Sequence, residues 1–86
     1  MPRLSTFFGI AIYIYMREHF PPHFHAKYGD FEVEIAIKDL RILEGKLPPK
    51  ALGMVIEWAA THQDELNENW NLISKGMEHK PIEPLK

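Results

Sequence analysis

Hydrophobic positions in the first half of the chain recur with period two, which predicts β-strands. In the stretch 7–16, Ile10, Ile12 and Ile14 fall on one side. The other side is also fairly apolar, so we expect a central strand. A brief edge strand is predicted over residues 41–44.

Two further strands are predicted over residues 23–28 and 31–37, joined by Gly29 and Asp30. Glycine at the first of two loop positions favours a type II′ hairpin, and the loop length fixes the register. One face of this hairpin is then apolar and the other polar. The polar face consists of His23, His25, Lys27, Glu32 and Glu34, with His25 opposite Glu34.

From residue 49 to about residue 75 the apolar period changes to 3.6, which predicts a helix. The unbroken phase favours one long helix. The alternative is a break near Thr61, because Thr61 followed by Asp64 resembles a helix cap. Trp58 lies off the centre of the apolar stripe and is a candidate exposed anchor for a partner, with burial by the tail as the alternative.

We therefore expect a single domain over residues 1–86 with an extended tail at about 77–86. The fold class is α+β. An antiparallel sheet of three to four strands carries one long, or kinked, C-terminal helix on its apolar face, and the His/Glu face is left open.

Composition narrows the function classes. A net charge of −2 counts against generic nucleic-acid binding, and the absence of cysteine excludes disulfides and thiolate metal sites. The longest apolar run is too short to cross a membrane, and the first residues lack a secretory pattern. A cytoplasmic protein without membrane association is expected.

Histidine is concentrated at one point of the chain. His19, His23 and His25 surround a Pro21-Pro22 step and make up three of the five histidines. Histidines two apart on a strand point the same way, and imidazole suits zinc or another divalent transition ion. These three histidines are a candidate metal set, and the simpler alternative is a polar sheet face with cross-strand His–Glu pairs.

The same face also suits acid/base catalysis. His23, His25 and Glu34 are the candidate catalytic residues, because a carboxylate opposite a histidine favours its protonated form. Such a set could cleave RNA without a metal. The neighbouring ligand or partner face is predicted to comprise Tyr13, Tyr15, Arg17, His19, Lys27 and Glu32.

Several motifs resemble those of a small bacterial family, Domain of Unknown Function 4160. The resemblance covers nearly the whole chain, and the Pro-Pro-His-Phe-His-Ala string is its most specific part. The matching segments are residues 8–10, 19–29, 43–48, 58–66, 70 and 82–85, and their reactive side chains are His19, His23, His25, Tyr28, His62 and Glu65.

Members of that family lack an assigned activity and often lie beside another small protein, in an arrangement similar to a toxin–antitoxin pair. The resemblance implies a small cognate protein partner or a homo-oligomer. The first hypothesis is therefore a partner-binding component that uses the His/Glu face. The alternatives are a histidine-dependent RNA-cleaving toxin and a divalent-metal-binding protein.

Overall fold

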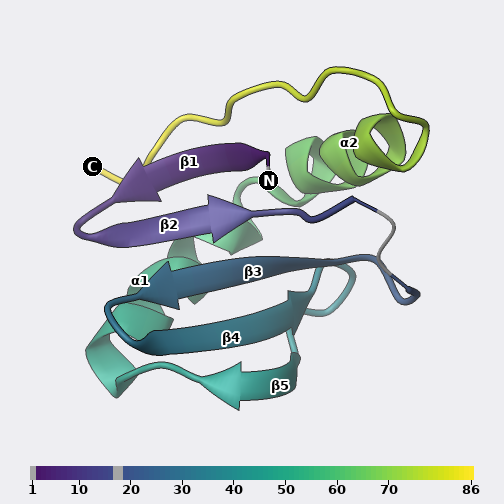
Figure 1. Ribbon diagram of the computed structural model, residues 1–86. Coiled ribbons are helices and arrows are strands. Elements are labelled where there is room, and N and C mark those ends of the chain that lie inside the picture. The colour runs from purple at the N-terminus through teal and green to yellow at the C-terminus, as the bar shows by residue number, and fades with distance from the viewer. Residues whose placement is uncertain (1, 17–18) are drawn as a thin grey trace.

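The computed structural model describes residues 2–16 and 19–86, which form one antiparallel sheet followed by two helices (Figure 1). The sheet order is β1-β2-β3-β4-β5, so each strand pairs with its neighbours in sequence. The helix α1 crosses behind the sheet, and α2 lies beyond the end where β2 stops and β3 begins. The elements are β1 (Arg3–Phe7), β2 (Ile10–Tyr13), β3 (His23–Tyr28), β4 (Phe31–Ala36), β5 (Ile42–Lys46), α1 (Pro49–Ala60) and α2 (Gln63–Ser74).

The expected sheet of three to four strands is wrong, because Arg3–Phe7 forms a further strand and a turn follows it near the start of the predicted first strand. Phe7 pairs with Ile10, which leaves Phe8 and Gly9 as a two-residue loop between β1 and β2. Both loop residues have positive φ, 49° and 79°, as a type I′ hairpin requires. Phenylalanine is rare at positive φ, so only Gly9 of the two loop residues indicates this turn in the sequence.

The expected single long helix is also wrong, because the chain leaves helical geometry at Thr61 and His62. The Thr61 hydroxyl donates to the carbonyl oxygen of Trp58 (3.0 Å) as α1 ends. The Gln63 side chain then donates to the carbonyl oxygen of Ile37 (2.7 Å), which ties the start of α2 to the end of the sheet. The apolar phase continues across the break because both helices face one core.

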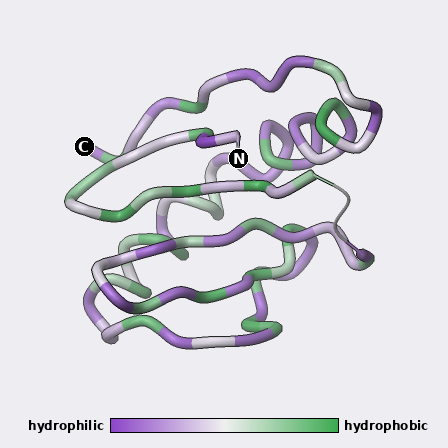
Figure 2. Tube along the Cα trace, in the orientation of Figure 1, coloured by the Kyte–Doolittle hydropathy of each residue, from purple (hydrophilic) through white to green (hydrophobic). Residues whose placement is uncertain are grey.

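The β3–β4 register is the predicted one in every pair, from Tyr28 with Phe31 to His23 with Ala36. Gly29 has φ +59° at the first loop position, whereas Asp30 has a negative φ, which is the type II′ combination. Hydrophobic and hydrophilic positions follow one another along these strands (Figure 2). This alternation separates a buried face from a face that carries the histidines.

Helix α1 and the tail close the apolar face of the sheet. Trp58 on α1 is buried, so its predicted role as an exposed anchor is wrong; its indole nitrogen donates to the Glu83 carbonyl (2.8 Å). The tail runs back beside β1, where the buried Ile82 donates its amide to the carbonyl of Leu4 (2.8 Å). No helix in the described part of the chain is long and apolar enough to span a bilayer.

Candidate metal centre

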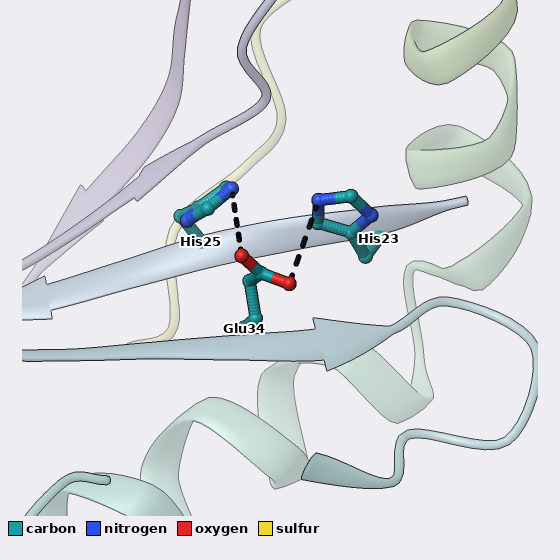
Figure 3. A group of neighbouring side chains, drawn as sticks. All are labelled: His23, His25 and Glu34. Atoms are coloured by element: carbon teal, nitrogen blue, oxygen red, sulfur yellow. Dashed lines mark ion pairs between the residues drawn. The ribbon is translucent and has the colours of Figure 1, made fainter. Parts of the chain in front are cut away.

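The alternation of β3 and β4 brings three metal-ligating side chains together on one face of the sheet. Figure 3 shows Glu34 rising from β4 between the imidazoles of His23 and His25 on β3. His23 Nε2 lies 3.8 Å from Glu34 Oε2, and His25 Nε2 lies 3.9 Å from Glu34 Oε1. One ligand atom from each residue lies within 4.8 Å of the other two. Both histidine–carboxylate gaps are too long for a hydrogen bond.

Each imidazole is held through its other nitrogen. His23 Nδ1 lies 2.8 Å from the carbonyl oxygen of Pro21, and His25 Nδ1 lies 3.0 Å from Glu32 Oε2. Because both oxygens are acceptors, each Nδ1 carries the proton, and in the neutral ring the lone pair is on Nε2. Nδ1 donation to a carbonyl or carboxylate is the arrangement that orients metal-binding histidines.

The carboxylate behind His25 is itself anchored. The Tyr15 hydroxyl donates to Glu32 Oε2 (3.2 Å), the oxygen that also accepts from His25. The Tyr15 ring lies against the His25 ring, with centroids 4.2 Å apart. Tyr15, which follows β2, and Glu32 of β4 therefore fix the orientation of the His25 imidazole on β3.

The face is not open at the histidines, contrary to the expectation from sequence. His23 is 1% exposed and His25 is 5% exposed. Trp70 of α2 lies against His23 with ring centroids 5.3 Å apart, and Tyr15 covers His25. The Glu34 side chain is 20% exposed, so the group is reached from the carboxylate side.

The remaining predicted face residues surround this group without joining it. The His19 ring lies 5.5 Å from the His23 ring, but His19 is exposed and is not among the three converging ligands. Tyr13 accepts a hydrogen bond from Arg3 (3.1 Å), and Lys27 lies 6.0 Å from the Tyr13 ring. Arg17 lies outside the described residues. The metal set His19, His23 and His25 stays a prediction.

A pocket of about 250 Å³ adjoins the group on the side of β5. Its lining includes Glu44 and Gly45, which belong to the segment 43–48 of the family resemblance but were not predicted as site residues. Glu44 is the cross-strand partner of Glu34, so the two carboxylates share one face. An irregular register at this point of the β4–β5 ladder hid the pairing from sequence reasoning. The pocket is lined by His25, Glu32, Val33, Glu34, Glu44 and Gly45.

Comparison with known proteins identifies the family. The model of the family described as "Domain of unknown function (DUF4160)" matches residues 9–71. The chain belongs to the DUF4160 family. No curated protein and no solved structure matches this DUF4160 chain. The matched range contains the two histidines, Glu34 and the whole lining of the pocket.

The donor set of this DUF4160 protein fits a divalent transition ion. Two imidazole nitrogens and one carboxylate are a known ligand combination for zinc and for ferrous iron. Tetrahedral zinc would set its ligand atoms about 3.3 Å apart, whereas one ligand atom from each residue lies within 4.8 Å of the other two, so the group would contract by up to about 1.5 Å on binding. Rotation of one carboxylate and small side-chain shifts supply such a change.

A second histidine–carboxylate pair of the DUF4160 chain lies at the junction of the helices. His62 Nδ1 lies 2.5 Å from Glu65 Oε1, and the His62 ring lies 5.2 Å from the ring of Trp58. Both residues belong to the motifs that carry the family resemblance. The pair lacks a third ligand among the described residues, and it fixes the first turn of α2.

Proposed function

We propose that this protein binds a divalent transition-metal ion, such as zinc, through His23 Nε2, His25 Nε2 and the carboxylate of Glu34. The observation that carries the proposal is that one ligand atom from each of the three residues lies within 4.8 Å of the other two, with both Nε2 atoms facing the Glu34 carboxylate at 3.8 and 3.9 Å. The orientation of both rings supports it, because each Nδ1 is engaged by an oxygen and each Nε2 carries the lone pair.

Charge on the sheet face supports the same conclusion. Glu32 has Lys27 and Lys46 as its cross-strand partners, so its negative charge is offset on both sides. Glu34 instead has Glu44 on one side and His25 on the other. Like charges directly opposite each other destabilise a sheet, and a bound cation would remove that cost.

The partner-binding role implied by the family resemblance remains a prediction. The buried histidines offer little area to another protein, so the proposal assigns them to an ion. Co-purification with the product of a neighbouring gene would test the partner hypothesis separately.

Zinc titration by calorimetry, with protein prepared without a histidine tag and stripped with a chelator, tests the proposal. One ion should bind per chain, and His25→Gln or Glu34→Gln should each weaken binding by more than about 100-fold. His79→Gln is the matched control, because it removes a histidine from the tail. His19→Gln should also leave affinity within about twofold, since its ring lies outside the ligand group.

Two results would refute the proposal. The first is no stoichiometric binding to correctly folded protein. The second is equal affinity in the wild type and in both ligand variants, with circular dichroism showing that each variant is folded.

A further inference from the structure

A pocket adjoins the proposed metal-binding group and could hold a ligand beside the ion. His25 and Glu34 belong both to the ligand group and to the pocket lining. Catalytic zinc sites have three protein ligands and leave one position for water or substrate, whereas structural sites are closed by four. An ion held by the three side chains described above would border the pocket on the Glu34 side, where the group is accessible to solvent.

Glu44 supplies a carboxylate in that pocket that is not part of the ligand group. It projects from β5 on the same face as Glu34, its cross-strand partner, and its side chain is exposed. Its carboxylate is not one of the three groups that converge within 4.8 Å. A carboxylate next to a metal-activated water, but not bound to the metal, is placed to accept a proton.

Gly45 lets β5 approach β4 closely beside the pocket. It has φ +81°, and a Cβ at this position would lie 2.2 Å from the carbonyl oxygen of Glu32. Only glycine lets β5 approach β4 this closely. Gly45 and Val33 both line the pocket at this close approach.

The lining also restricts the charge of a ligand. It contains three carboxylates, and the described residues that form it include neither lysine nor arginine. Lys27 and Lys46 flank Glu32 as its cross-strand partners but do not line the pocket, so a phosphodiester would meet three carboxylates with the proposed ion as its cationic contact. At about 250 Å³ the pocket is smaller than those that hold drug-sized ligands, so it suits a small molecule or the end of a larger one.

We propose that the metal centre is hydrolytic, that its pocket takes a small acyl compound without negative charge, and that Glu44 is the general base. This proposal rests on the proposed metal binding. An ion held by His23, His25 and Glu34 would supply an activated water; Glu44 would take one proton from that water as its oxygen bonds to the carbonyl carbon of an ester or amide. The bond to the leaving alcohol or amine then breaks, and that group takes the proton from Glu44. The products are a carboxylic acid and the alcohol or amine.

Two chromogenic probes and one variant test the proposal. The zinc-loaded full chain is assayed with p-nitrophenyl acetate, an uncharged ester, and with bis(p-nitrophenyl) phosphate, an anionic phosphodiester. Ester hydrolysis should exceed that of the chelator-treated protein and of free zinc, and the phosphodiester should react no faster than with free zinc. Glu44→Gln should lower kcat/KM for the ester by about 10²–10⁴-fold, with zinc affinity within about twofold of the wild type. Glu57→Gln, which removes an exposed carboxylate from α1, is the matched control.

The outcomes separate the two proposals. Zinc binding without ester hydrolysis, or equal ester hydrolysis by the wild type and Glu44→Gln, overturns the hydrolytic proposal and leaves metal binding standing. Faster reaction of the phosphodiester overturns the substrate class and points to RNA. Failure to bind zinc overturns both proposals.

Discussion

Substitution of Glu34 by glutamine should change stability in opposite directions with and without metal. In the metal-free protein the carboxylate faces Glu44 directly across the β4–β5 ladder. Removal of one charge should stabilise the sheet by about 0.3 kcal/mol, a value reduced by solvent because Glu44 is exposed. With zinc present the same substitution removes a ligand, so stabilisation by the ion should disappear.

The magnitude with metal follows from binding linkage. Free zinc at 100 times its dissociation constant stabilises the folded protein by about 2.7 kcal/mol. A domain of this size shifts its Tm by about 4–8 °C per kcal/mol, so zinc should raise the Tm of the wild type by about 11–22 °C. For Glu34→Gln we expect a shift below about 2 °C, together with a chelator-treated Tm about 1–2 °C above the wild type.

Thermal unfolding followed by circular dichroism, with chelator or zinc at about pH 8, measures both effects, because imidazoles must be neutral to coordinate. Glu44→Gln is the matched control. It relieves the same repulsion but keeps all three ligands, so its zinc shift should stay within about 2 °C of that of the wild type. A full zinc shift in Glu34→Gln would refute the assignment of this carboxylate as a ligand.

Three other substitutions test the elements that build the site. Glu32→Gln should weaken zinc binding by about 10-fold in calorimetry, because it removes the charge behind His25; unchanged affinity would show that this contact does not orient the ring. Gly45→Ala should lower the free energy of unfolding, measured in urea, by more than about 3 kcal/mol, because the added Cβ would clash with the β4 backbone and φ is positive there. Gly53→Ala, on the exposed face of α1, should instead raise the free energy of unfolding by about 0.5–1 kcal/mol. Equal effects at the two glycines would rule out the close β4–β5 approach. Ile82→Ala should lower the free energy of unfolding by about 2–4 kcal/mol, because the tail packs into the core. Met77→Ala, at an exposed tail position, should change it by less than about 0.5 kcal/mol. Equal effects of the two substitutions would show that the tail is not docked.

The part of the site that follows from sequence is the β3–β4 hairpin. Its two-residue loop and strict alternation determine every cross-strand pair, so His25 opposite Glu34 could be predicted. Alternation is a local property, and it suffices to place His23 and His25 on one face. The edge position of the last strand could also be predicted.

The remainder depends on contacts that sequence patterns do not contain. Burial of His23 comes from Trp70, a residue of α2 far away in the chain. The tautomers depend on backbone and carboxylate oxygens whose positions follow from the folded loop. Glu44 reaches the pocket through an irregular register, and Phe8 adopts a turn conformation that its residue type disfavours. Tertiary packing overrides local preference at these positions.

The most direct test of the central claim is a crystal structure of the zinc-loaded protein with anomalous diffraction recorded at the zinc absorption edge. We predict one strong anomalous peak per chain, about 2.0–2.2 Å from His23 Nε2, His25 Nε2 and one oxygen of Glu34. No peak at this position, or a peak only at another pair such as His62 and Glu65, would contradict it.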